Sequence, residues 1–214
     1  MKDAISAGKF VDSYSVEIRP EMSAYKFEER DFEHPSALFV IEDMLKGLIG
    51  GRLLYYPYFK TFGLKGDEKV LDFGCGGGAG SRCLLKFLNQ NGCLTCVDTS
   101  NFWIDKTRKR LDKYSNVECR AGDIRELDIP DSAFDVVSVI HVIHDIPQAE
   151  RQDTVKALSR KLKAGGMVFV REPTKESHGM PVEEILALFS EAGLKETDSK
   201  ATKSEYMGRF QKRG

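Results

Sequence analysis

The sequence lacks any apolar run long enough to cross a membrane and carries almost no net charge. Its apolar runs stay well below the roughly 20 residues that span a bilayer. The 32 Lys and Arg residues nearly balance the 33 Asp and Glu residues, which leaves a net charge of −1. The first 20 residues have no apolar core of signal-peptide length. We therefore expect a cytoplasmic protein that binds no membrane and has no bias towards nucleic acid.

Cysteine is also sparse, and an odd number of cysteines is present. The five are Cys75, Cys83, Cys93, Cys96 and Cys119. An odd number fits poorly with a disulfide framework, so we expect reduced thiols. Cys93 and Cys96 have the spacing of a metal-binding pair, but no second pair follows them. The sequence therefore predicts buried thiols and no metal site.

What is present is a regular alternation of short apolar segments with amphipathic ones. The 214 residues, 41% of them hydrophobic, suffice for one α/β domain with a small addition. From residue 69 the alternation is typical of a parallel sheet covered by helices. The predicted strands are residues 69–73, 93–97, 117–121, 134–140 and 167–171, then 195–201 and 205–212. Helices are predicted at 81–88 and 101–114, after Pro147, and between Pro181 and Gly193.

The N-terminal part has a different composition. Residues 35–48 have the spacing of an amphipathic helix, and many aromatic residues surround them. We interpret residues 1–62 as a small helical cap of the same domain, packed on residues 63–214. The cap is expected to close over a ligand pocket.

The most informative segment is residues 70–80, Val-Leu-Asp-Phe-Gly-Cys-Gly-Gly-Gly-Ala-Gly, between a predicted strand and a predicted helix. Glycine permits positive φ and lets backbone N–H groups approach a ligand. Because Gly74, Gly76 and Ala79 also fit a dinucleotide-binding fingerprint, an NAD(P)-dependent oxidoreductase remains an alternative here. Asp72 favours a cationic ammonium group as its partner, because a carboxylate there would repel a pyrophosphate.

A second acid follows the second predicted strand. Asp98 lies about two dozen residues after Gly74, at the position where an acid accepts hydrogen bonds from ribose hydroxyls. NAD would need the same acid, so Asp98 indicates a nucleoside and not one particular cofactor. The alternative role for Asp98, and for Asp123 after the third strand, is helix capping.

Five segments, in the same order, resemble the motifs of class I S-adenosylmethionine-dependent methyltransferases. They are residues 70–80, 96–100 (Cys-Val-Asp-Thr-Ser), 121–125 (Ala-Gly-Asp-Ile-Arg), 134–141 and 162–168. The chain is most similar to the small-molecule group that includes the quinone-biosynthesis C-methyltransferases. The resemblance implies an α/β, Rossmann-like, seven-stranded and mostly parallel sheet, with an antiparallel last strand and helices on both faces. It also implies S-adenosyl-L-methionine as cofactor, bound by Asp72, Gly74, Gly76, Asp98, Thr99, Asp123, Ile124 and His141.

Other polar residues follow the strands at the edge where ligands bind in such sheets. After the fourth strand, His144 is the candidate general base, oriented by Asp145, because a neutral imidazole is available near pH 7. The alternative is that His144 structures a turn. Glu172, after the fifth strand, either faces the methyl acceptor or forms a surface ion pair. Tyr55 and Tyr58 either form a wall around the acceptor or pack inside the cap.

The sequence thus predicts methyl transfer to an unidentified, small-molecule acceptor. A non-catalytic nucleoside-binding protein on the same fold is the second alternative, because fold does not establish activity. The oligomeric state cannot be predicted from these features.

Overall fold

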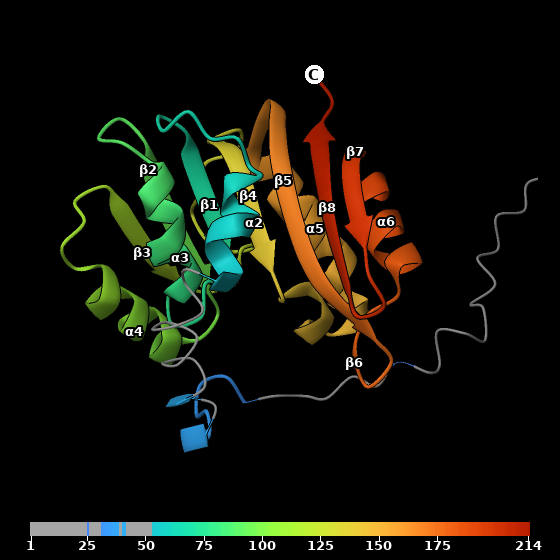
Figure 1. Ribbon diagram of the computed structural model, residues 1–214, viewed down its shortest axis with the longest axis horizontal. Coiled ribbons are helices and arrows are strands. Elements are labelled where there is room, and N and C mark those ends of the chain that lie inside the picture. The colour runs from blue at the N-terminus through green and yellow to red at the C-terminus, as the bar shows by residue number, and fades with distance from the viewer. Residues whose placement is uncertain (1–24, 26–30, 39, 42–52) are drawn as a thin grey trace, which may run out of the picture.

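One mixed sheet organises the protein in the computed structural model, which describes residues 25, 31–38, 40, 41 and 53–214. The main strand order is β3-β2-β1-β4-β5-β8-β7 (Figure 1). β1 (Lys69–Phe73) pairs in parallel with β2 (Cys93–Asp98) and β4 (Phe134–Ile140), and these pair in parallel with β3 (Val117–Ala121) and β5 (Leu162–Lys175), respectively. β8 (Glu205–Lys212) lies between β5 and β7 (Leu194–Ala201) and is antiparallel to both. The predicted Rossmann-like sheet with a reversed last strand is confirmed.

The central strands are apolar because both of their faces are covered. Successive side chains of a strand point to opposite faces. Val70 and Val136 enter one apolar cluster, whereas Leu71 and Val137 enter the other. All four side chains are buried. This double burial explains why β4 has a nearly continuous apolar sequence instead of alternating with polar residues.

Helices cover both faces of the sheet. Buried side chains of α2 (Tyr56–Lys60), α3 (Ala79–Leu84) and α4 (Asn101–Leu111) pack against one face. Those of α5 (Gln148–Lys161) and α6 (Val182–Glu191) pack against the other. Figure 1 shows α2 and α3 in front of the sheet and α5 behind it. A short 3₁₀ turn, η3 (Leu85–Phe87), continues α3.

The fifth strand is longer than its apolar core predicts. It begins at Leu162, opposite Phe134 of β4, and continues past Arg171 through Pro173 to Lys175. Its end pairs with β6 (His178–Gly179), a short strand that no sequence pattern indicated. Glu172 therefore lies within β5, whereas the sequence placed it after the strand.

Most of the predicted cap lies outside the described residues. In the predicted helix at residues 35–48, residues 37, 38, 40 and 41 are helical, and the others, except 35 and 36, are not described. At the end of the segment, Phe59 of α2 is fully buried and the ring of Phe62 stacks on Phe169 with centroids 3.8 Å apart. In the described part of the chain, no helix combines the length and apolar character needed to span a membrane.

Candidate functional site

The glycine segment after β1 forms a tight loop at the carboxyl edge of the sheet. Gly74 and Gly76 have φ values of 68° and 50°, in the region that favours glycine. The N–H of Gly74 donates to the carbonyl of Val97 over 2.8 Å, which ties the loop to β2. A Cβ atom on Gly74 would lie 2.3 Å from Cγ2 of Val142. Only glycine therefore allows this loop to approach the segment that follows β4.

Asp98, at the end of β2, is bonded directly to the glycine loop. Its Oδ2 accepts the N–H of Gly76 over 2.9 Å, and its Oδ1 accepts the N–H of Ser100 over 3.0 Å. Burial raises the pKa of the Asp98 carboxyl. Each carboxylate oxygen has a further lone pair, so both oxygens retain capacity for ligand hydroxyl groups. The two sequence motifs that indicated a nucleoside thus form one structural unit.

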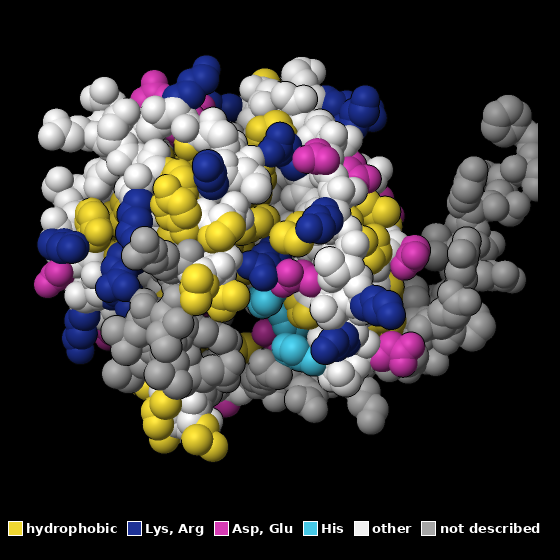
Figure 2. Space-filling view, in the orientation of Figure 1, with side chains coloured by type: hydrophobic (Ala, Val, Ile, Leu, Met, Phe, Trp, Pro, Cys, Tyr) yellow, Lys and Arg dark blue, Asp and Glu magenta, His cyan; other side chains and the backbone are white. Residues whose placement is uncertain are grey.

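Beside this unit lies a cavity of about 350 Å³, a size typical of small-molecule sites. Loops after four strands contribute to it, as expected at the point where strand order reverses on either side of β1. The predicted residues that line it are Tyr55, Gly74, Gly76, Asp98, Thr99, Asp123, Ile124, His141 and Asp145. Figure 2 shows histidine and acidic side chains gathered around a hollow on one face of the molecule.

One end of the cavity is polar. Asp123 accepts hydrogen bonds from Arg125 through both carboxylate oxygens, and the Arg125 guanidinium lowers the pKa of this carboxyl. Arg125 also reaches Oε2 of Glu150 over 2.6 Å. Arg125 and Glu150 line the cavity, although the sequence analysis did not select them. Arg125 follows Asp123 by two residues, and this spacing is the sequence signal that could have identified Arg125 as a site residue.

Aromatic side chains form much of the remaining wall. Phe32, Phe73 and Trp103 line the cavity and were not predicted as site residues. The carbonyl of Phe32 accepts a hydrogen bond from Ser100 Oγ over 2.8 Å, which holds this N-terminal residue beside the start of α4. Trp103 belongs to the apolar side of α4, so its spacing indicated only core packing.

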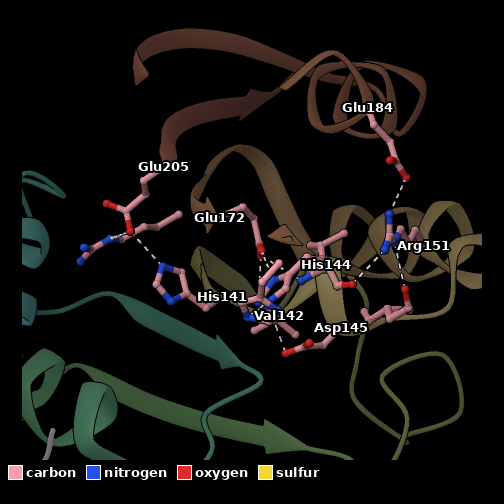
Figure 3. Close-up of polar contacts among 12 residues, drawn as sticks. His141, Val142, His144, Asp145, Arg151, Glu172, Glu184 and Glu205 are labelled. Atoms are coloured by element: carbon pink, nitrogen blue, oxygen red, sulfur yellow. Dashed lines mark hydrogen bonds and ion pairs between the residues drawn. The ribbon is translucent and has the colours of Figure 1, made fainter. Parts of the chain in front are cut away.

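The segment after β4 is held by one buried carboxylate. Glu172 Oε1 accepts the N–H groups of Val142 and Ile143 over 2.9 and 2.8 Å. Glu172 Oε2 lies 2.6 Å from Nδ1 of His144 (Figure 3). Arg151 donates to the carbonyls of His144 and Ile146, both over 2.9 Å. These contacts fix the backbone that carries His141 and Asp145 to the cavity.

His141 occupies a strained position in this segment. Its φ of 57° is unusual for a residue with a side chain. Its Nε2 lies 2.9 Å from Oε1 of Glu205, and Arg171 donates to the same oxygen over 2.7 Å. The surrounding β5 and β8 strands thus hold the imidazole at the cavity wall.

Four predicted site residues do not line the cavity. Asp72 is buried and accepts a hydrogen bond from Ser81 Oγ over 2.6 Å. Tyr58 is buried with the guanidinium of Arg171 above its ring, as the packing alternative for it predicts. Glu172 and His144 are buried against one another. Their proposed contacts with ligands stay predictions.

The residues present fit an S-adenosyl nucleoside. Gly74 lets the loop lie against Val142 beside the cavity, and Asp98 offers two acceptor oxygens there. Comparison with known proteins agrees with this chemistry, since residues 70–166 match the family described as "Methyltransferase domain". Over this segment, which carries the glycine loop, Asp98 and Asp123, the chain is similar to methyltransferases. The fold is that of S-adenosylmethionine-dependent methyltransferases of known structure.

Individual methyltransferases are similar to the chain in sequence or in fold. Demethylmenaquinone methyltransferase of Staphylococcus aureus is 29% identical over 131 residues, which are 61% of this chain. The chain spans about half of that relative, 53% of its length. An S-adenosylmethionine-dependent methyltransferase from Aquifex aeolicus has a TM-score of 0.63 at 20% identity, over 72% of this chain and 87% of that one. The N-methyltransferase NodS from Bradyrhizobium japonicum, solved with S-adenosyl-L-homocysteine, has a TM-score of 0.60 at 18% identity, over 70% and 80%.

Proposed function

We propose that the protein transfers a methyl group from S-adenosyl-L-methionine to a small-molecule acceptor. The observation that carries this proposal is the carboxylate of Asp98 bonded to the N–H of Gly76 beside the cavity. A carboxylate in this position accepts hydrogen bonds from the two hydroxyls of a ribose. The match to the methyltransferase domain supports a methyl donor instead of a nicotinamide cofactor.

The cofactor supplies an electrophilic methyl group on a sulfonium ion, so the protein mainly has to align two ligands and exclude water. We assign Gly74 and Gly76 to backbone contacts with the cofactor, and Asp98 with Thr99 to the ribose. Trp103 and Ile124, both buried and both in the cavity wall, would enclose the adenine. The polar end of the cavity at Asp123 would meet the adenine amino group.

The acceptor side is proposed to be the wall made by Tyr55, His141 and Asp145. These three side chains line the cavity together with the glycine loop. His144 is buried behind this wall, so its imidazole reaches the cavity through Asp145, 3.4 Å from its Nε2. A role of His144 as general base therefore requires transfer through Asp145 or a movement of the segment.

Calorimetric binding tests the proposal directly. S-adenosylmethionine and S-adenosylhomocysteine should bind the full chain, whereas NAD and NADP should not. Asp98→Ala should weaken binding of the first two at least about tenfold, because charge-assisted hydrogen bonds contribute about 1.5–3 kcal/mol each. Asp67→Ala, which changes an exposed acid in the turn before β1, is the matched control. Binding of a nicotinamide cofactor would overturn the proposal.

Binding without turnover would indicate the non-catalytic alternative. The screen for turnover should measure formation of S-adenosylhomocysteine with small phenols, quinols, amines and thiols as acceptors. Thermal unfolding of both variants should accompany these experiments, because Asp98 also fixes the backbone of Gly76 and Ser100. An Asp98→Ala protein with a wild-type unfolding temperature and lost affinity would isolate the contact with the ribose.

A further inference from the structure

Three side chains with metal-binding atoms converge at Asp145, in the cavity wall proposed for the acceptor. They are His144 and Asp145 of η4 (Ile143–Asp145) and His178 of β6. Nε2 of His144 lies 3.2 Å from Nε2 of His178 and 3.4 Å from Oδ2 of Asp145. The three ligand atoms all lie within 4.8 Å of one another. No sequence pattern indicated this cluster, because His178 is 34 positions from His144 and reaches it through the β5–β6 hairpin.

The two separations from His144 fit ligands that share one cation. Zinc binds histidine nitrogen and carboxylate oxygen at about 2.0–2.2 Å, and angles of about 90–110° then place neighbouring ligand atoms about 2.8–3.6 Å apart. Both distances from His144 Nε2 fall in this interval. The rings of His144 and His178 stand at 82° to one another, with centroids 4.6 Å apart. They therefore meet through their nitrogen edges and not by stacking.

Glu172 orients the imidazole of His144 for metal binding. Its Oε1 already accepts two backbone N–H groups, and its Oε2 lies 2.6 Å from Nδ1 of His144. A carboxylate accepts a hydrogen bond from Nδ1 in the Nδ1–H tautomer, and in that tautomer the lone pair of Nε2 faces His178 and Asp145. A carboxylate on the far nitrogen is the usual support of a metal-binding histidine. Both residues are buried, which fixes the direction of the lone pair.

We propose that His144 Nε2, His178 Nε2 and a carboxylate oxygen of Asp145 bind a divalent transition-metal ion, with Zn²⁺ as the ion that this ligand set suits best. Two imidazoles and one carboxylate form a three-ligand site, which in zinc proteins leaves a fourth position open. Asp145 also lines the cavity. The open position therefore lies on the acceptor side of the methyltransferase site.

The ligand expected at the open position is an oxygen or sulfur donor with a dissociable proton, such as a phenol, an alcohol or a thiol. The identity of this ligand rests on the proposed function, because the metal ion would then hold the methyl acceptor. Metal binding itself does not depend on methyl transfer. It can be measured on the protein without cofactor or acceptor.

The alternative to a metal ion in this cluster is a proton shared between the side chains. An N–H of His178 donated to His144 Nε2, or a doubly protonated His144, would also explain the short distances. Binding of a coloured metal ion separates these cases. Co²⁺ replaces Zn²⁺ in such sites and absorbs visible light with an intensity that depends on the coordination number.

The experiment is a titration of Co²⁺ into untagged full-length protein that has been freed of metal and kept reduced. We expect one equivalent of Co²⁺ to give visible absorption without a thiolate charge-transfer band, and Zn²⁺ to displace it. His178→Ala and Asp145→Asn should each weaken Co²⁺ binding at least about tenfold, and Glu172→Gln should weaken it about tenfold through His144. His34→Ala is the matched control, since the His34 side chain is 82% exposed.

Three outcomes would overturn the proposal. They are no visible absorption with the wild type, a thiolate band that places Co²⁺ on the cysteines, and unchanged binding in both His178→Ala and Asp145→Asn. Circular dichroism of each variant tests folding, and His178 lies on a two-residue strand whose loss leaves the main sheet paired. Failure of metal binding leaves the calorimetric test of S-adenosylmethionine untouched, so the two proposals fail separately.

Discussion

The Oε2 atom of Glu172 lies 2.6 Å from the Nδ1 atom of His144, across 28 positions of the chain. Both side chains are buried. The other oxygen of Glu172 accepts two backbone N–H groups of the segment after β4. One acid of β5 thus holds both the backbone and the imidazole of the cavity wall.

Glu172→Ala should lower the free energy of unfolding by about 3 kcal/mol, because two buried N–H groups lose their acceptor. Urea denaturation at neutral pH measures this effect. Glu191→Ala, at an exposed position in the last turn of α6, should change stability by less than about 0.5 kcal/mol. Equal effects of the two substitutions would show that the Glu172 network does not stabilise the fold.

Gly74→Ala and Gly193→Ala form a matched pair. Their φ values are 68° and 78°, so both substitutions carry the strain of left-handed backbone, about 1–2 kcal/mol. Only at Gly74 would the new Cβ meet another side chain, 2.3 Å from Val142 Cγ2, whereas none lies within 4 Å at Gly193. We expect Gly74→Ala to destabilise the protein more and to weaken S-adenosylhomocysteine binding at least about tenfold. Gly193→Ala should bind normally, and similar affinities in both variants would remove the glycine loop from the binding site.

Trp103 is the single tryptophan of the chain and lines the cavity. Its fluorescence should therefore change in intensity or wavelength when S-adenosylhomocysteine binds, because the ligand changes the surroundings of the indole. The titration should saturate with the dissociation constant found by calorimetry. Trp103→Phe removes the signal while calorimetry still detects binding. A spectrum that does not respond to saturating ligand would place the nucleoside elsewhere.

Asp72 should make stability depend on pH. Burial raises the pKa of this carboxyl to about 6, above its unfolded value, so the folded state retains a proton that the unfolded state releases. Stability from this group is therefore highest below pH 4, falls as pH rises from 4 to 6 and is constant above that, with a total loss of up to about 3 kcal/mol.

Asp72→Asn removes this titration while it keeps an oxygen that accepts from Ser81. The stability of the variant minus that of the wild type should therefore increase between pH 4.5 and pH 7.5. Chemical denaturation at both values measures it. A difference that is constant with pH would mean that Asp72 is ionised in the folded protein throughout this range.

The central strands β1 and β4 were predictable because nearly all of their residues are apolar and buried. The bounds of β1, β3, β4 and β8 agree with those predicted. β5 extends beyond its apolar core because Glu172 and Pro173 pair with β8, a partner more than 30 residues away that no local pattern specifies. For the same reason the β5–β6 hairpin, and with it the position of His178, could not be predicted.

The candidate site was predictable where a motif specifies the backbone. Gly74, Gly76 and Asp98 were selected by their spacing, and the structure brings them together at the cavity. The side-chain contacts of the wall were not predictable. Glu172 was expected at a ligand or at the surface, yet it is buried with three donors around it. Its partners lie in the segment after β4, about 30 residues earlier in the chain, and no local pattern specifies this contact.

The place of β8 has a consequence for truncated forms of the protein. This strand is hydrogen-bonded to β5 on one side and to β7 on the other. Deleting residues 205–212 would therefore not shorten the sheet at its border but open two unpaired strand edges within it. Exposed edges of this kind recruit strands from other molecules, so such a deletion would convert the protein into an aggregation-prone species.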